Sequence, residues 1–436
     1  METKTRARAS QTRSSRNVFF NLSIFQFLAF LRRGIFYTFM INYLYMLMPT
    51  ATLTASLGTL NMIASSLGQN LLWGRICDRY KLRAKLIVMG EMIAGFAYII
   101  VFLIHKSLID SGSSFAAGLA IIFGLSVLEF FWSMSDVGWA ALLTDVTTSE
   151  IRGRIIGILN FIASLGRMVG IIFAGFLYAD GEGFRNGIIF YIVTFLLFIG
   201  AAIMALLSRY KMQRLVQEQP IRKEKEERES KIADENEKAY MWFLVALIII
   251  VLGAASINQI FLLFLKLKGG LNASDQEMSS ILTAWAIGGM IASAVSGRIA
   301  DKIGRNKVML SGLSLAAVTP LLYSAASNFL SMALAYGLNG VSFWTVQTVG
   351  FAFAGDIIPE HKRGRLLSRY NTVMALSWGP AGIFIGGLLA DVQVKIFGFS
   401  EHTAFVNAFY TSSIIVMLGT LLFAIKFAKL KTPFKL

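Results

Sequence analysis

The sequence predicts an all-α integral membrane protein with twelve transmembrane helices in two pseudo-symmetric six-helix bundles. Apolar residues make up 56% of the 436-residue chain and charged residues 15%, long apolar runs recur from end to end, and loop motifs repeat between the two halves. Helices that span a bilayer require this composition. The composition excludes a soluble globular protein.

Twelve apolar runs approach the roughly 20 helical residues needed to cross the hydrocarbon core of a bilayer. Because lipid offers the backbone no hydrogen-bonding partners, each run is expected to be helical. In the N-terminal half the runs are 18–47, 53–72, 86–104, 115–143, 155–177 and 188–207. In the C-terminal half they are 241–265, 278–295, 308–323, 329–353, 366–389 and 405–427.

Residues 1–16 form a basic tail that precedes the N-terminal bundle, 17–209. The tail is rich in Arg and Ser and resembles a mitochondrial targeting segment. An apolar run begins directly after it and is too long for the apolar part of a cleaved signal peptide. We therefore expect a cytoplasmic tail followed by the first membrane helix.

Residues 210–238 form the long charged segment between the sixth and seventh runs. Glu and Lys at helical spacing predict a solvated, partly helical cytoplasmic linker, with a membrane-surface segment as the alternative. The C-terminal bundle, 239–428, and a tail, 429–436, follow the linker.

The distribution of basic residues predicts the orientation of the chain in the membrane. With an even number of spans, both termini and the connections after the even-numbered spans share one side, and that side carries 33 of the 41 Lys and Arg residues. That count includes Arg369 and Lys426, which lie near the cytoplasmic ends of the eleventh and twelfth runs. Five basic residues fall in the opposite loops, and three lie deeper inside spans. We expect both termini in the cytoplasm and the protein in a plasma or inner membrane.

The sequence contains no pattern that predicts a disulfide, a metal site, an enzyme active site or a nucleic-acid interface. Cys77 is the single cysteine and the three histidines are scattered, so no disulfide, metal site or cofactor is expected. An enzyme would need a nucleophile with a neighbouring base or a pair of carboxylates, and the sequence offers neither. The positive net charge follows the membrane loops, so it does not predict a nucleic-acid partner.

The two halves are internal repeats. The second run is followed by G-R-I-C-D-R at 74–79, and the eighth by G-R-I-A-D-K at 297–302. After the fourth and tenth runs an Asp precedes an Arg-Gly-Arg triplet by seven positions, at 145–154 and 356–365. These two Asp residues are 211 positions apart, and the same offset matches Asn160 with Asn371 and Gly175 with Gly386.

The loop at 74–83 resembles the signature loop of the major facilitator superfamily, G-x-x-x-D-R-x-G-R-R in broad form, and the loop at 297–305 resembles its second copy. One departure is Leu82, near the place where the family has a glycine in the turn, whereas the second copy keeps Gly304. The resemblance covers essentially the whole chain. It implies a monomeric protein that moves a small solute across the bilayer by alternating access.

By this resemblance, charged residues of the four repeated loops form a cytoplasmic gate. Asp and Arg can form short, directional charge-assisted hydrogen bonds that break together. The alternative is that these residues satisfy the positive-inside rule and cap helix ends, which leaves the repeated Asp positions unexplained. The expected gate residues are Asp78, Arg79, Arg83, Asp145, Arg152, Asp301, Lys302, Arg305, Asp356 and Arg363.

Charged residues inside apolar runs are costly in hydrocarbon and indicate function. Glu129 and Arg167 fall at similar depth on adjacent runs, so they could form a static pair. Alternatively, Glu129 or Asp136, seven residues further along the same helical face, binds and releases a proton. Arg32 and Arg33, with Arg167, also permit an anionic solute held by guanidinium groups.

In the family, helices 1, 4, 7 and 10 line the solute cavity, and polar or aromatic residues occur there in this chain. Aromatic rings offer a stacking surface and amides fix orientation, although each one alone could equally serve helix packing. The expected cavity residues are Arg32, Tyr37, Asn42, Glu129, Trp132, Asp136, Arg167, Asn258, Gln259, Asn339, Trp344 and Gln347.

These patterns predict a secondary active transporter of a small organic solute, with proton symport as the expected mode. Export by antiport and uniport are the alternatives. The fifth run lacks the Gly-Pro of the family's drug antiporters, which instead occurs at 379–380. A solute sensor that does not transport is a further alternative, which degenerate gate motifs or an added domain would favour; neither is present.

Overall fold

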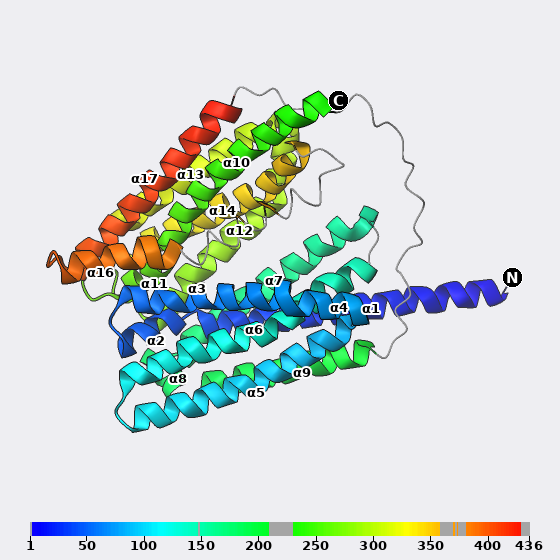
Figure 1. Ribbon diagram of the computed structural model, residues 1–436, viewed down its shortest axis with the longest axis horizontal. Helices are drawn as coiled ribbons and strands as arrows, with labels where there is room; N and C mark the ends of the chain where they lie inside the picture. Colours follow the sequence, from blue (N-terminus) through cyan, green and yellow to red (C-terminus); the bar gives the residue numbers. More distant parts are fainter. Residues whose placement is uncertain are drawn as a thin grey trace. The chain divides into compact units, whose positions relative to one another are not determined.

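The chain is all-helical throughout the part that the computed structural model describes: residues 2–146, 149–208, 230–357, 369–370, 373 and 381–428 (Figure 1). No strand occurs in these ranges. Ten helices or helix pairs in this part of the chain are long and apolar enough to cross a membrane. The prediction of an all-α membrane fold is confirmed.

The N-terminal helices follow the predicted runs, with two departures. The first run is interrupted at residues 38–39, and the second contains a π-helical segment, η1. The elements are α1 (Glu2–Tyr37), α2 (Met40–Leu47), α3 (Ala51–Leu67), η1 (Gly68–Trp73), α4 (Gly74–Tyr80), α5 (Arg83–Asp110), α6 (Ser114–Val146), α7 (Ser149–Leu177), η2 (Ala179–Gly181), α8 (Glu182–Arg185) and α9 (Ile188–Ser208).

The C-terminal helices repeat this arrangement. The seventh run is interrupted at Ile257, and most of the eleventh, expected at 366–389, lies outside the described residues. The elements are α10 (Ser230–Ser256), α11 (Asn258–Lys266), α12 (Asp275–Ile303), α13 (Arg305–Ala325), α14 (Phe329–Ile357), the π-helical η4 (Gly382–Gly387), α16 (Leu388–Lys395) and α17 (Glu401–Phe427).

The chain forms two compact units. One contains Met1–Tyr43 and Leu60–Ile221, and the other contains Leu44–Thr59 and Arg222–Leu436. We call them the N-terminal and the C-terminal unit. The predicted domain boundaries, at 209/210 and 238/239, stay predictions, and the linker 210–229 and the tail 429–436 lie outside the described residues.

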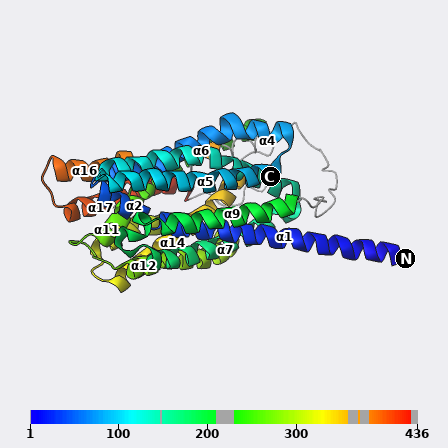
Figure 2. The same cartoon turned by 90° about the horizontal axis from the view of Figure 1, so that it is seen from below.

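Helix pairs α5–α6 and α1–α7 build the N-terminal unit, and Figure 2 shows α5 alongside α6. Glycines let α1 and α7 approach closely: a Cβ atom at Gly166 or Gly170 would overlap the carbonyl oxygen of Phe27 or Leu31 on α1. Small residues at such interfaces are typical of membrane helices, where close van der Waals packing drives association.

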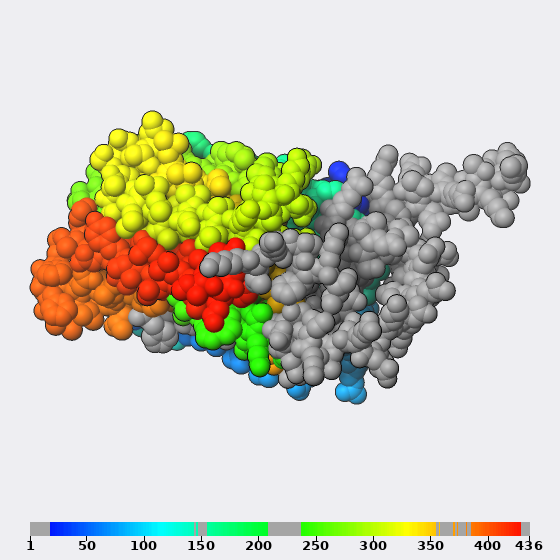
Figure 3. Space-filling model, turned by 90° about the horizontal axis from the view of Figure 1, so that it is seen from above, coloured from blue at the N-terminus to red at the C-terminus, as the bar shows by residue number. Residues whose placement is uncertain are grey.

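The C-terminal unit packs α10, α13, α14 and α17 around a buried aromatic cluster that includes Phe243, Phe353 and Phe423. Figure 3 shows α17, in red, on the surface of this unit. An apolar stripe at helical spacing, including Ile414, Leu418 and Ile425, is exposed along α17. A stripe of this kind fits contact with lipid tails.

The segment Leu44–Thr59 contains the end of α2 and the first half of α3, and it belongs to the C-terminal unit although the residues on both sides of it belong to the N-terminal unit. The carboxylate of Asp391, on α16, accepts hydrogen bonds from the backbone N–H groups of Ala51 (3.0 Å) and Thr52 (2.8 Å). These are the first residues of α3, whose N–H groups have no intrahelical acceptor. Asp391 therefore caps α3 from a distant part of the chain.

Candidate functional site

A buried ion pair lies at the centre of the N-terminal unit. Arg32 of α1 is 2% exposed and Glu91 of α5 is fully buried. The guanidinium group binds both carboxylate oxygens, with 3.1 Å between Nη2 and Oε1. On α6, Trp132 Nε1 and Ser135 Oγ each donate to Oε1 at 2.9 Å. Buried charges require such partners, and these bonds satisfy the Glu91 carboxylate. Among the described residues, Arg32 Nε has no hydrogen-bond partner.

Glu91 is a site residue that the sequence interpretation missed. It lies within the expected third run, 86–104, and the rule that charged residues inside apolar runs indicate function applies to it as it does to Glu129. Candidate residues were expected on the helices that line the cavity in the family, and the third helix is not one of them.

A second ion pair in the same unit is partly exposed. Arg33 Nη2 lies 3.4 Å from Asp136 Oδ1, and the two side chains are 33% and 45% exposed. The Arg33 guanidinium also lies over two aromatic rings, 5.1 Å from the centroid of Trp132 and 5.3 Å from that of Phe30. Glu129 is close enough to act electrostatically on Arg33.

The other predicted residues of the N-terminal unit have different surroundings. Tyr37 is partly buried beside Tyr98, Asn42 is buried, and Arg167 on α7 is exposed. The arginines that act on Glu129 include Arg33 and Arg32. The pairing of Glu129 with Arg167 stays a prediction.

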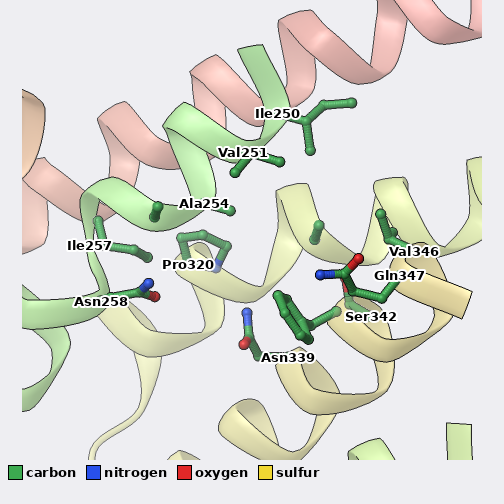
Figure 4. Close-up of a pocket in the computed structure, with 13 residues that line it drawn as sticks. Ile250, Val251, Ala254, Ile257, Asn258, Pro320, Asn339, Ser342, Val346 and Gln347 are labelled. Carbon is green, nitrogen blue, oxygen red and sulfur yellow. The ribbon is translucent and has the colours of Figure 1, made fainter. Parts of the chain in front are cut away.

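The C-terminal unit contains a pocket that brings together three predicted residues, Asn258, Asn339 and Gln347 (Figure 4). The pocket has an empty volume of about 660 Å³, including the space at its mouth. Its walls are mainly apolar, and none of the lining residues among the described side chains is charged.

The polar groups of this pocket are held by the helices around it. Asn339 on α14 accepts a hydrogen bond from Trp285 Nε1 (3.0 Å) and donates one to Thr319 Oγ1 (3.3 Å), which fixes its carboxamide. Asn258 is exposed at the first position of α11, directly after the helix break. Gln347 lies two turns beyond Asn339 on α14.

Two further residues predicted for this site lie elsewhere in the C-terminal unit. Gln259 donates to the backbone oxygen of Ala55 at 3.5 Å. Trp344 packs against Gly289 and Trp285 on α12 and is not among the pocket-lining residues.

Part of the predicted gate in the N-terminal unit is assembled. Arg83 Nε donates to Asp145 Oδ2 at 2.8 Å, and Arg83 Nη1 donates to the backbone oxygen of Cys77 at 2.7 Å. Asp78 and Arg79 are exposed. The side chain of Arg152 lies outside the described residues.

The turns of the two signature loops differ. By spacing from Gly74 and Gly297, the residue that corresponds to Gly304 is Lys81, so the departure falls at Lys81 and not at Leu82. Lys81 has φ 52° and ψ 37°, whereas Gly304 has φ 103° and ψ 135°, a conformation essentially restricted to glycine. The first loop therefore turns in a left-handed conformation that a side chain can adopt.

In the second loop, Arg305 lies 3.6 Å from Asp301 and donates to the backbone oxygen of Ala352 on α14 at 3.0 Å. Lys302 is exposed. The side chain of Asp356 and all of Arg363 lie outside the described residues. The action of these residues as a gate stays a prediction.

Comparison with known proteins identifies relatives of one kind. A family model described as Major Facilitator Superfamily matches residues 22–270 and 244–435. An uncharacterized MFS-type transporter of Mycobacterium tuberculosis is 28% identical over 121 residues, which are 27% of this chain and 17% of that protein. The quinolone resistance protein NorA of Staphylococcus aureus is 26% identical over 147 residues, 34% of this chain and 37% of NorA. The matches thus span well under half of these relatives.

Solved structures share the fold over nearly the full length. A bacterial homolog of the human lysosomal transporter Spinster has a TM-score of 0.69 at 12% identity and covers 95% of this chain and 97% of its own. The nucleoside transporter NupG has a TM-score of 0.66 at 14% identity and covers 95% of this chain and all of its own. At these identities the similarity shows the fold alone.

Proposed function

Since the chain belongs to the Major Facilitator Superfamily, we propose that it is a secondary active transporter that moves a small organic solute by alternating access, with protons as the coupling ion. The observation that carries the proposal is the partly exposed group of Arg33, Asp136 and Glu129 in the N-terminal unit. In this group one carboxylate, that of Asp136, pairs with the guanidinium, and a second, that of Glu129, lies within electrostatic range.

The two ion pairs of this unit suit different roles. Glu91 is fully buried and accepts hydrogen bonds from Arg32, Trp132 and Ser135, so its charge is compensated and fixed. Asp136 is ion-paired with Arg33, and Glu129 is close enough to act electrostatically on both, so Glu129 can take up a proton while Asp136 keeps the arginine neutralised. We assign proton coupling to Glu129, with Asp136 and Arg33 as its partners.

The solute is proposed to be neutral or cationic and largely apolar. Arg32 and Arg33 already have carboxylate partners, which removes the main support for an anionic solute held by these arginines. The pocket of the C-terminal unit offers apolar walls with the carboxamides of Asn258, Asn339 and Gln347. Such a surface suits an uncharged ring system that carries one or two hydrogen-bonding groups.

Two directions of transport are consistent with this site. Symport remains the first candidate, because the fifth run lacks the Gly-Pro that drug antiporters of the family have. Antiport is the second candidate, and the similarity to the quinolone resistance protein NorA favours it.

The test is uptake of a panel of labelled solutes into proteoliposomes that contain the purified full-length protein. The panel holds sugars, amino acids, nucleosides, organic anions and apolar cations, each with an inside-alkaline and an inside-acid pH gradient. Accumulation under the inside-alkaline gradient indicates symport, and accumulation under the inside-acid gradient indicates antiport. Glu129→Gln should lower gradient-driven accumulation at least about tenfold, which corresponds to about 1.4 kcal/mol.

Exchange of labelled for unlabelled solute without a pH gradient separates coupling from binding. Glu129→Gln should retain exchange, whereas Asn339→Ala should weaken it by raising the KM for the solute. Glu277→Gln is the matched control, because Glu277 is exposed in the first turn of α12 and serves a capping box. Equal gradient-driven accumulation by the wild type and Glu129→Gln would exclude Glu129 as the coupling group.

A further inference from the structure

The indole ring of Trp132 lies close to two neighbouring guanidinium groups. Arg32 Cζ is 4.5 Å and Arg33 Cζ is 5.1 Å from its ring centroid. Both distances are within the range of cation–π attraction, which is strongest for Trp and gains strength where water is excluded. Trp132 is 4% exposed. Its ring therefore contacts both the buried and the partly exposed arginine of the N-terminal unit.

The orientation of this ring depends on Glu91. An indole has one polar group, the Nε1–H donor. In Trp132 this donor bonds to Glu91 Oε1 at 2.9 Å, inside a helix bundle where an unsatisfied N–H would be costly. The same oxygen accepts from Ser135 on α6 and from Arg32 on α1. Glu91 thus connects α5 to both helices.

We propose that Glu91 is a positioning residue: it fixes the Trp132 indole so that the ring face holds Arg33 toward Asp136 and Glu129. The inference deepens the proposed function, because it explains how a long, partly exposed arginine is kept beside the coupling carboxylates. Glu91 itself is fully buried and acts through Trp132.

The energetics favour a fixed ring over a mobile one. The Arg33 side chain is 33% exposed and its bond to Asp136 is long, at 3.4 Å, so the ion pair by itself contributes little order. Contact with Trp132 restricts the guanidinium, which costs less side-chain entropy when the ring is already immobile. Phe30, 5.3 Å away, supplies a second ring that Glu91 does not hold.

The test uses Trp132 fluorescence, which needs no solute. The parent is the full chain with the other six tryptophans replaced by Phe. Two double variants are compared in it, Arg32→Met with Glu91→Gln and Arg32→Met with Glu91→Leu. Both remove the two buried charges together, which avoids the large cost of leaving one charge buried and unpaired. They differ in whether residue 91 retains an oxygen that can accept the indole N–H.

We expect the Gln variant to keep the emission maximum and anisotropy of the parent, because the amide oxygen replaces the carboxylate oxygen as acceptor. The Leu variant should show a red-shifted maximum and at least about twofold greater quenching by iodide, since a released N–H turns toward water. The Gln variant should unfold close to the temperature of the parent, and the Leu variant at a lower temperature, because the Trp132 N–H and the Ser135 hydroxyl lose their acceptor.

Identical Trp132 emission, anisotropy and quenching in the two variants would overturn the proposal, because the acceptor at position 91 would then not determine the ring position. A parent in which iodide quenches Trp132 as strongly as free tryptophan would also overturn it. Neither result depends on transport, so failure of this inference is distinguishable from failure of the proposed function.

Discussion

At the residue scale, Arg83 is notable because one side chain serves two partners. It binds the carboxylate of Asp145 and the backbone oxygen of Cys77. The Asp145 side chain is 49% exposed, so the ion pair is screened and contributes about 0–1 kcal/mol. The bond to Cys77 is made to a backbone carbonyl, where a typical net contribution is about 1 kcal/mol.

Arg83→Ala should therefore destabilise the protein more than Asp145→Ala does. We expect a loss of about 1–2 kcal/mol for Arg83→Ala and about 0–1 kcal/mol for Asp145→Ala in the free energy of unfolding, measured by denaturation in mixed micelles. Lys85→Ala, at an exposed position of the same helix, is the control and should be near neutral. Equal losses for Arg83→Ala and Asp145→Ala would show that the Cys77 bond adds nothing.

At the element scale, two of the glycines in α7 differ in how closely other atoms pack around them. A Cβ atom at Gly170 would overlap the carbonyl oxygen of Leu31 and crowd Gly34 on α1, whereas a Cβ atom at Gly157 would meet nothing within 4 Å. Both glycines lie in the same helix, so helix propensity favours alanine at each by about 1 kcal/mol. The two substitutions therefore differ in packing alone.

We expect Gly157→Ala to raise the unfolding temperature slightly and Gly170→Ala to lower it, because backbone atoms of α1 cannot move aside as a flexible side chain can. Overpacking of this kind typically costs about 1–3 kcal/mol. Thermal unfolding in detergent, followed by static light scattering, measures both. A neutral Gly170→Ala would mean that α1 and α7 can separate without cost.

A second element-scale prediction concerns the cap on α3. Asp391→Ala removes the acceptor of the Ala51 and Thr52 N–H groups, and loss of an N-cap acceptor typically costs about 0.5–2 kcal/mol. Amide hydrogen exchange in the first turn of α3 should accelerate roughly tenfold. Asp391→Asn, which retains one acceptor oxygen, should show an intermediate rate. An unchanged rate in Asp391→Ala would show that another group satisfies these amides.

The helices were predictable from the sequence because each apolar run must hide its own backbone from lipid, but the breaks inside two runs were not. Neither break has a proline. At the first break the Thr38 hydroxyl bonds back to the oxygen of Gly34, and directly before the second the Ser256 hydroxyl bonds back to that of Gly253. Such bonds can bend helices, yet Ser and Thr occur throughout these runs, so hydropathy does not reveal where a break falls.

The candidate site was predictable to a similar degree. Asn258, Asn339 and Gln347 were expected to share a cavity and do line one pocket. The partners of the arginines were not expected, because pairing depends on which face each helix turns inward, and the weak amphipathicity of a buried membrane helix leaves that face undefined. The Arg32–Glu91 pair therefore required the structure.

At the scale of the whole molecule, orientation in the membrane determines which compartment each loop faces. The prediction rests on charge: 33 of the 41 basic residues fall on the side of the termini, a bias that is typical of cytoplasmic loops. Cys77 is the single cysteine, so Cys77→Ser gives a background in which one introduced thiol reports its own side. Exposed positions are available on both predicted sides.

Ser113→Cys and Phe397→Cys, in predicted outer loops, should react with a membrane-impermeant maleimide in intact cells, and Lys302→Cys should react only after permeabilisation. All three side chains are exposed, so a difference in labelling reflects the side of the membrane and not burial. Labelling of Lys302→Cys alone in intact cells would reverse the topology. The gate loops would then face outward. The direction of accumulation would not change, because the proton gradient and the coupling mode determine it for either orientation of the protein.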